Sequence, residues 1–439
     1  MSTSRDERKD FKKDALWLFS GGIGASIFSA VEVIVLARFL GVEQFGLFSL
    51  VMAYVQMVNS FIDLKISEAS IKYVSEYKER GDTESVSSFI KFFYIIDLLS
   101  GVVAFAVCIG LAQVANSLFI KSEDAFQYVL ILSFSLLIST VNQNSHAILQ
   151  SLKRFRESAF LRVFHNVVRI ALILAAFIAE LGMEGFFAAY VAAAFINFVV
   201  LQVFVNKALV REKAGGWMSA SLGRIRSKMR GALWFVMNTS VSGFAYLAFS
   251  THLPVILLGY FSGAEASGLY KVAHSVTRIV EKISGPVYSV LYPAMVRLSS
   301  RGNYKELRKM IVYSLKEMAK YLIPVCVAIF ALADLIVNIA FGSEYAPASS
   351  AIRVLIIAFT AAVLVSWVQH ALLAFGMSGL RTVLVMLAGV CMLLAMLILV
   401  PRYSYMGAAY ARFVPVFVII FAGIPVFSRI YRRKRRSRQ

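Results

Sequence analysis

Long apolar stretches alternate with short polar segments along the whole chain. A helix needs about 20 apolar residues to cross the hydrocarbon core of a membrane. The pattern predicts twelve membrane-spanning helices, at about residues 15–37, 45–62, 92–115, 127–148, 164–181, 186–206, 231–260, 268–293, 317–340, 350–374, 383–400 and 407–428. The first is too long for a signal peptide, and a second span follows almost at once. The segments between spans are too short for a soluble domain, which usually needs about 50 residues.

Composition supports a membrane protein. Hydrophobic residues make up 59% of the 439-residue chain and charged residues only 16%, against about 45–50% and about 25% in soluble domains. This excludes a disordered chain and argues against a large soluble enzyme. The sequence holds no P-loop, GxSxG or HExxH motif. We therefore expect a membrane transporter that is not an enzyme, uses no cofactor and binds no metal.

The formal charge of +20 has a topological explanation. With a cytoplasmic N-terminus, 35 of the 45 lysines and arginines fall in cytoplasmic segments, while Arg38, Lys121 and Arg402 alone fall in outer loops. This asymmetry predicts that both termini are cytoplasmic, in the inner (cytoplasmic) membrane of a cell. The basic tail, 429–439, directly follows a span, so we expect it to contact anionic membrane lipids and not nucleic acid.

The chain contains an internal repeat. Residues 33–48 match 255–270 without a gap at a constant offset of 222, with eight of sixteen positions identical. The repeat predicts two parallel six-helix units. The expected fold is an all-α integral membrane protein with twelve transmembrane helices in two pseudo-symmetric lobes. The predicted divisions are an N-terminal lobe, a cytoplasmic linker, a C-terminal lobe and a basic tail, at 1–206, 207–230, 231–428 and 429–439.

Each copy of the repeat joins the first two helices of its half. Gly41 and Gly263 occupy matching positions and permit a turn. Glu43 and Glu265 follow at the start of the next helix, where the helix dipole favours an anion. A second match aligns Arg80-Gly81-Asp82 with Arg301-Gly302-Asn303.

Ionisable residues inside membrane spans are costly and mark functional sites. On a helical wheel, Lys271, Arg278 and Lys282 share one face of the eighth span, with His274 on the same side. We expect this cationic stripe to line a cavity between the halves and to bind an anionic group. The matching face of the first half is polar but uncharged, and offers Gln56 and Asn59.

Other polar residues within or beside spans are further candidates. Glu32 is a candidate ion or proton site, or the partner of a cationic residue. Asp97 and Asp63 are the other candidates for ion coupling, while Arg169 and Arg353 are candidates for substrate binding. All eight prolines lie in the second half, and His252 and Pro254 mark a position where the seventh helix is expected to bend as a gate.

Several segments together resemble a known family. They are Ala15-Leu16-Trp17, Ala37-Arg38-Phe39-Leu40-Gly41-x-Glu43-x-Phe45-Gly46, Lys72-Tyr73 with Arg80-Gly81-Asp82, and Phe341-Gly342-x-Glu344-Tyr345. The chain resembles the polysaccharide or O-antigen (Wzx-type) flippases of the multidrug/oligosaccharidyl-lipid/polysaccharide exporter superfamily. The resemblance covers nearly the whole chain.

The resemblance implies two six-helix lobes around a central cavity. The implied substrate is an oligosaccharide or sugar on a polyprenyl (pyro)phosphate, moved by alternating access from the inner to the outer leaflet for lipopolysaccharide or other surface polysaccharide. Lys271, Arg278 and Lys282 would then pair with phosphate oxygens, and Gln56 and Asn59 with sugars. Other membrane proteins of polysaccharide assembly are further expected partners.

An ion-coupled multidrug or small-metabolite exporter of similar fold is the alternative. A drug exporter for cations should present an anionic cavity, which the cationic stripe disfavours. A facilitator-type sugar transporter should carry a short Gly-Asp-Arg loop between its second and third spans, and none is present.

Overall fold

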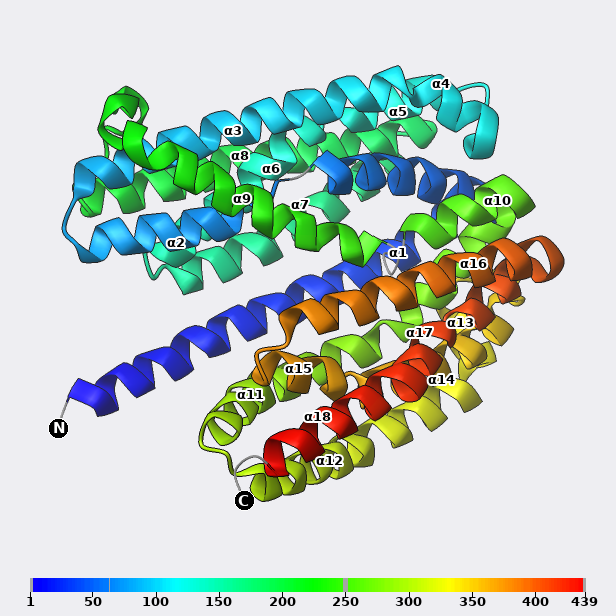
Figure 1. Ribbon diagram of the computed structural model, residues 1–439. Coiled ribbons are helices and arrows are strands. Elements are labelled where there is room, and N and C mark those ends of the chain that lie inside the picture. Colours follow the sequence, from blue (N-terminus) through cyan, green and yellow to red (C-terminus); the bar gives the residue numbers. More distant parts are fainter. Residues whose placement is uncertain (1–2, 63, 248–251, 437–439) are drawn as a thin grey trace. The chain divides into compact units, whose positions relative to one another are not determined.

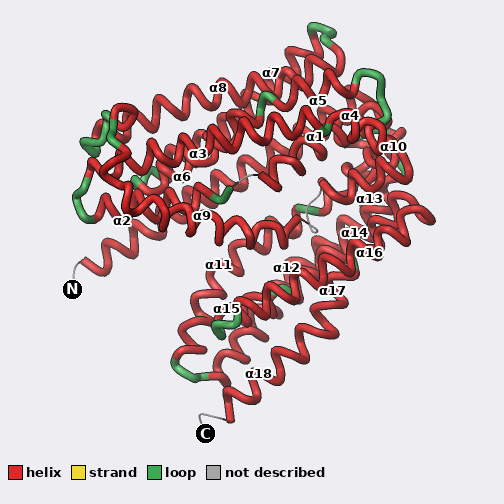
Figure 2. The backbone as a smooth tube through the Cα atoms, turned by 45° about the horizontal axis from the view of Figure 1, so that its top comes forward, coloured by secondary structure: helices red, strands yellow, loops and turns green. Residues whose placement is uncertain are grey.

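A computed structural model describes residues 3–62, 64–247 and 252–436, and this part of the chain is helical without a strand (Figures 1 and 2). The α-helices are α1 (Thr3–Ile62), α2 (Ile66–Glu79), α3 (Thr83–Gly110), α4 (Ala112–Ala115), α5 (Ala125–Ser133), α6 (Leu136–Ser151), α7 (Phe155–Ile178), α8 (Gly182–Arg211), α9 (Arg226–Leu247), α10 (His252–Thr277), α11 (Ile279–Ser300), α12 (Tyr304–Ala331), α13 (Ala333–Ala340), α14 (Ala348–Val365), α15 (Trp367–Ala374), α16 (Ser378–Ala411), α17 (Val414–Val418) and α18 (Ile424–Arg436). Short 3₁₀ or π turns separate some of them.

Eight helical stretches of the described residues are long and apolar enough to cross a membrane, or nine if α12 and α13, bent by 66° at their junction, form one span. They are Ser20–Ile62, Thr83–Gly110, Ala125–Ser151, Phe155–Ile178, Gly182–Arg211, Ala348–Ala374, Ser378–Ala411 and Val414–Arg433. The described residues of α9, α10 and α11, where the seventh and eighth spans are expected, do not belong to this set. The structure thus confirms a multi-pass helical protein, and the number twelve stays a prediction.

Three long helices contain a break where the sequence predicts an outer loop. Gly41 interrupts α1 with φ 72° and ψ 174°, and Gly263 interrupts α10 with φ 88° and ψ −176°. Ser404 interrupts α16 with φ 50°. The turns predicted at Gly41 and Gly263 are confirmed, and the matched residues adopt nearly the same conformation, which is almost restricted to glycine.

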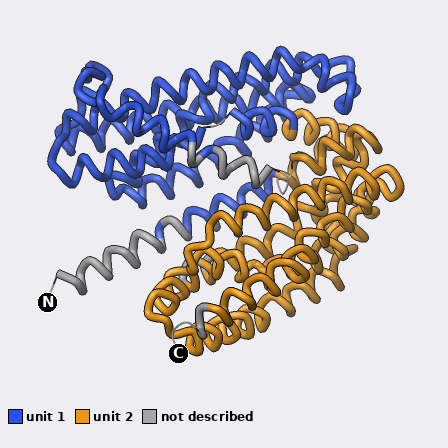
Figure 3. The backbone as a smooth tube through the Cα atoms, in the orientation of Figure 1, with its two compact units in different colours: residues 1–32, 54–244 blue, residues 33–53, 245–439 orange. Residues whose placement is uncertain are grey.

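The chain forms two compact units (Figure 3). Unit 1 contains residues 1–32 and 54–244, and unit 2 contains residues 33–53 and 245–439. The first copy of the repeat therefore belongs to the same unit as the second copy. This grouping differs from the linear division at residues 206 and 230.

Unit 1 has an aromatic core at the end that holds α2. The sequence indicates a polar or amphipathic cytoplasmic connection at residues 63–91, and Ile66, Val74 and Tyr77 are buried on one face of α2. Tyr73 stacks on Phe89 of α3 at 4.9 Å between ring centres. The amphipathic pattern of α2 thus packs a helix against α3 instead of leaving a solvated loop.

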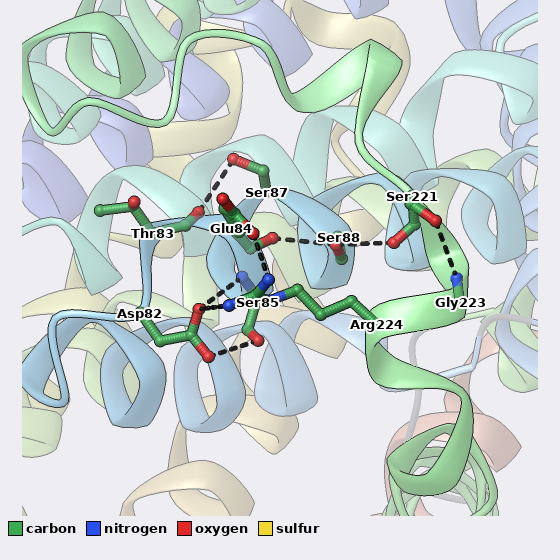
Figure 4. A network of polar contacts seen from close by, with 9 residues as sticks. All are labelled: Asp82, Thr83, Glu84, Ser85, Ser87, Ser88, Ser221, Gly223 and Arg224. Atoms are coloured by element: carbon green, nitrogen blue, oxygen red, sulfur yellow. Dashed lines mark hydrogen bonds and ion pairs between the residues drawn. The ribbon is translucent and has the colours of Figure 1, made fainter.

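The predicted linker is attached to unit 1 by the polar network of Figure 4. Ser88 donates to the carbonyl oxygen of Ser221 at 2.9 Å. Arg224 pairs with Asp82 at 3.3 Å and also with Glu84. Asp82 caps α3 by accepting from the Ser85 hydroxyl at 2.6 Å and from the Ser85 amide at 3.0 Å. These two bonds, and then the charge of Arg224, hold the pKa of Asp82 below its ordinary value.

The second repeat match has the same structural role. Gly81 and Gly302 have φ of 73° and 72°. Asp82 and the matching Asn303 each cap the following helix, Asn303 by accepting from the Glu306 amide at 3.2 Å. The shared sequence is a turn that ends one helix and caps the next.

Unit 2 brings the two copies of the main repeat into contact. Gly46 and Gly268 occupy matching positions, and both are buried. A Cβ on Gly268 would lie 2.6 Å from the Val42 carbonyl oxygen, and a Cβ on Gly46 would overlap the carbonyl of Ala264, the residue that matches Val42. The contact is therefore nearly two-fold symmetric, and only glycine permits it.

The segment that follows α13 completes this contact. The Tyr345 hydroxyl donates to the Ala37 carbonyl oxygen at 3.0 Å, and Phe45 packs edge-on against Tyr345. The Arg38 guanidinium donates to the last carbonyls of α13, including that of Ala340 at 2.8 Å. Two of the segments that carry the family resemblance thus meet in one structure.

Candidate functional site

Unit 2 gathers the predicted cations around His274. His274 is buried on α10, with its ring 5.9 Å from Tyr270 and 5.4 Å from Phe359 of α14 between ring centres. Lys271 and Arg278 lie about one helical turn before and after His274, and the Arg278 amide donates to the His274 carbonyl oxygen at 3.1 Å. Arg412 lies over the ring of Phe359, which packs against His274. The structure therefore brings together three of the four residues of the predicted stripe and adds Arg412.

Glu281 lies between Arg278 and Arg412 and contacts both. Its carboxylate lies 3.5 Å from Arg412 and 3.9 Å from Arg278. The Arg412 guanidinium also lies 4.6 Å above the ring of Phe359, and its side chain is only 11% exposed. One carboxylate thus faces several cations, so the cluster carries excess positive charge that suits an anionic ligand.

The expected eighth span is not one uninterrupted helix. α10 ends at Thr277 and α11 begins at Ile279, with Arg278 at the junction. Arg278 keeps helical dihedrals and accepts a backbone bond from Lys282 at 3.3 Å, so the order of the cations along the axis is preserved. Arg278 and Lys282 are exposed, whereas Lys271 is half-buried.

Unit 1 contains a separate buried ion pair. Arg169 of α7 donates to the Glu32 carboxylate of α1, with Nε at 2.8 Å, and Tyr190 of α8 donates to the other carboxylate oxygen. Arg169 also bonds Asn166 at 2.7 Å. Of the two roles expected for Glu32, the structure realises the pairing with a cation.

A second buried carboxylate lies between α3 and α6. Asp97 is 2% exposed and accepts a bond from the Asn144 amide, while Ser70 of α2 donates to the oxygen of that amide. The Asp97 backbone carbonyl accepts from Thr140 at 3.1 Å. The side chain of Asp97 is therefore part of a hydrogen-bond chain through three helices.

The remaining predicted residues lie apart from these clusters. Arg353 pairs with Asp334 and donates to the Phe330 carbonyl oxygen at 3.3 Å. Asn59 and Gln56 are half-buried on α1, and the Asn59 side-chain oxygen is buried without a hydrogen-bond partner in the described part of the chain.

The predicted gate falls at the start of α10. His252 is the first described residue of this helix, and Pro254 is buried two positions later. Asp63 lies outside the described residues. Over the described ranges, no three histidine, cysteine, aspartate or glutamate side chains could hold a metal ion together.

Glu281, the partner of Arg278 and Arg412, is not among the residues predicted from the sequence. Glu281 follows Arg278 by three residues, a spacing that favours a pair on a helix, and this signal could have identified it. Arg412 is 134 positions from Arg278, and no local pattern connects them.

The apolar helices define a multi-pass helical membrane protein. The chain belongs to the polysaccharide biosynthesis protein family, whose model matches residues 11–299. The resemblance noted from the sequence motifs is thereby confirmed.

Individual relatives and structures agree with this family. The chain is 24% identical over 412 residues to the probable low-salt glycan biosynthesis flippase Agl15 of Haloferax volcanii, covering 92% of this chain and 80% of that protein. An inward-facing multidrug resistance MATE family transporter of the MOP superfamily matches with TM-score 0.75 at 14% identity, covering 94% of this chain and 96% of that one. The lipid II flippase MurJ, in an inward closed conformation, matches with TM-score 0.72 at 16% identity, covering 95% and 90%. The chain thus shares its fold with these two structures.

Proposed function

We propose that the protein is a flippase that moves a sugar or oligosaccharide linked to a polyprenyl (pyro)phosphate from the inner to the outer leaflet. The membership in the polysaccharide biosynthesis family supports this proposal, as does the likeness to a glycan flippase. The observation that carries it is the cation cluster of unit 2, because its net positive charge within a membrane protein suits a lipid-linked phosphate.

The proposed architecture has twelve spans in two lobes around a central cavity, with both termini in the cytoplasm and the protein in the inner membrane. Alternating access between the lobes would expose this cavity to each leaflet in turn. Proline-rich segments of the second half, with His252 and Pro254 at the start of α10, would form the bending region.

The proposed substrate contacts follow from chemistry. Arg278, Lys271 and Lys282, with Arg412, would bind phosphate oxygens, and His274 would contribute a ring N–H. Gln56 and Asn59 would bond sugar hydroxyls, and the buried oxygen of Asn59 is an acceptor for such a bond. Arg169 and Arg353 already contact Glu32 and Asp334, so they would reach substrate only by exchanging a carboxylate for a phosphate.

Ion coupling is assigned to the carboxylates of the first half. Glu32 would take up a proton or cation when it separates from Arg169, because the pair must open before the carboxylate can bind another ion. Asp97 and Asp63 are the other positions proposed for coupling.

The decisive test compares Arg278→Ala with Glu281→Gln. Loss of a charged hydrogen bond of about 1.5–3 kcal/mol should weaken binding of a polyprenyl pyrophosphate-linked sugar about ten- to a hundredfold in Arg278→Ala. Glu281→Gln removes the opposing charge, so binding should stay equal or become tighter. If both variants lose binding alike, the arginines act only as structural partners of Glu281 and the proposed site is wrong.

Transport is measured by complementation of a flippase-deficient strain, with surface glycan as the readout. Arg301→Ala is the matched control, since Arg301 is an exposed arginine in the turn after α11 of the same unit. Wild type and Arg301→Ala should restore glycan, and Arg278→Ala should not. The fold shared with a MATE transporter supports one alternative, an ion-coupled multidrug or small-metabolite exporter. Drug resistance without restored glycan would favour it.

A further inference from the structure

Unit 1 contains a cavity of about 510 Å³ between the beginning of α1, the beginning of α7 and the end of α8. Its walls include Trp17, Ser20, Arg156, Glu157, Phe160 and Phe204. Beside the cavity α1 and α7 are in close contact, because a Cβ on Gly21 of α1 would lie 2.6 Å from the Cβ of Ala159 of α7. This contact between small residues lets α1 and α7 approach closely, while larger side chains line the cavity.

The walls combine aromatic surface with a cation. The Arg156 guanidinium lies 5.3 Å above the Trp17 ring, and both Trp17 and Phe160 are exposed, at 36% and 59%. The Glu157 carboxylate is paired with Arg154 at 3.1 Å. Since Arg154 balances Glu157, Arg156 leaves the cavity with an excess positive charge beside apolar rings.

The three helix ends around the cavity lie at one level of the predicted membrane topology. The charge distribution along the sequence places three helix ends at the cytoplasmic surface. They are the start of α1, the start of α7 and the end of α8. Tryptophan together with arginine is typical of the membrane interface, where rings contact acyl chains and cations contact headgroups.

We propose that this cavity binds the headgroup of an anionic phospholipid of the inner leaflet. Arg156 bonds the phosphate, and Trp17 and Phe160 contact the glycerol and the first part of the acyl chains. The volume lies in the range that holds a small ligand, and the local charge favours an anionic over a zwitterionic headgroup. This lipid is a resident ligand, so the proposal does not depend on the substrate or direction of transport.

Binding of phosphatidylglycerol and phosphatidylcholine to the detergent-purified full chain tests the proposal by native mass spectrometry. The wild-type protein should bind phosphatidylglycerol more tightly than phosphatidylcholine. Arg156→Gln should lose about fivefold in that affinity, the value of one basic residue near a membrane surface, and Arg156→Lys should retain most of it. Trp17→Ala should weaken binding of both lipids.

Lys153→Gln is the matched control, because Lys153 is an exposed cation in the turn just before α7 and does not line the cavity. It should change phosphatidylglycerol affinity less than twofold. Equal losses in Lys153→Gln and Arg156→Gln would reveal unspecific surface attraction and overturn the proposal, as would equal affinity of wild type for the two lipids.

Competition separates a resident lipid from the transported one. A polyprenyl monophosphate should displace phosphatidylglycerol from wild type no better than phosphatidylglycerol displaces itself. Displacement at much lower concentration, lost in Arg156→Gln, would assign the cavity to the transported lipid and overturn the proposal. Failure of Arg278→Ala to affect transport would contradict the proposed function and leave these binding results unchanged.

Discussion

The Gly46–Gly268 contact allows a prediction with a magnitude that follows from the structure. A Cβ on Gly268 would lie 2.6 Å from the Val42 carbonyl oxygen, so the two backbones must separate by on the order of 1 Å to reach van der Waals distance. Backbone cannot turn away as a flexible side chain does. Overpacking of this kind costs about 1–3 kcal/mol. A cost of about 2 kcal/mol lowers the equilibrium constant for forming the contact about 30-fold.

Gly268→Ala should therefore lower the melting temperature of the purified protein, and Gly46→Ala should do the same. The double variant should lose less than the sum of the two, because one separation of the backbones relieves both overlaps. Residues in direct contact commonly show such coupling of about 0.5–3 kcal/mol.

Gly379→Ala is the control within the same unit. Gly379 lies in the first turn of α16 with no atom near its added Cβ, so alanine should be neutral or slightly stabilising. Gly263 also has open space, but its φ of 88° is unfavourable for alanine, and Gly263→Ala should lose about 1–3 kcal/mol through backbone strain alone. Equal melting temperatures for Gly268→Ala and Gly379→Ala would refute the close contact.

Three further predictions concern polar contacts. The pKa of Asp82 is lowered in the folded protein by Ser85 and by Arg224. The contribution of the Asp82 carboxylate to folding stability should therefore be complete above the ordinary carboxyl pKa and should be lost as the pH falls through the lowered pKa of the folded protein. Hydrogen exchange in the linker should follow this loss in wild type and not in Asp82→Asn, which keeps the helix cap. Arg169→Leu should lower stability by about 3–5 kcal/mol because it leaves the Glu32 carboxylate buried without its cation, and the double variant with Glu32→Leu should recover part of the loss in melting temperature. Tyr345→Phe should cost about 1 kcal/mol in thermal unfolding through one buried hydrogen bond; an unchanged melting temperature would contradict that bond.

Local pattern predicted the features that local chemistry determines. The apolar stretches predicted a multi-pass helical protein, and the glycines of the repeat predicted the breaks at Gly41 and Gly263. The same pattern did not predict that Gly46 and Gly268 contact each other, because two similar segments carry no information on whether they pack together. It allowed an amphipathic connection at α2 but did not predict that α2 packs against α3, since the partner of an amphipathic face is not determined locally.

The chemistry of the site depends on residues far apart in the chain, and a helical wheel describes one helix at a time. The wheel therefore grouped Lys271 and Arg278 on one face but could not add Arg412, which is linked to Arg278 through Glu281. For the same reason Glu32 and Arg169 had separate expected roles, although 137 positions apart they form one ion pair.

The two repeats agree in backbone features and differ in chemistry. Gly41 with Gly263 and Gly46 with Gly268 are matched turns and contacts, whereas the position that matches Glu32 is Pro254 and the position that matches Arg278 is Gln56. A turn is needed in each half, so duplication retains it. The charges of the ion pair in unit 1 and of the cation cluster in unit 2 are therefore not repeated at these matching positions. Loss of either cluster should therefore not be compensated by the other half.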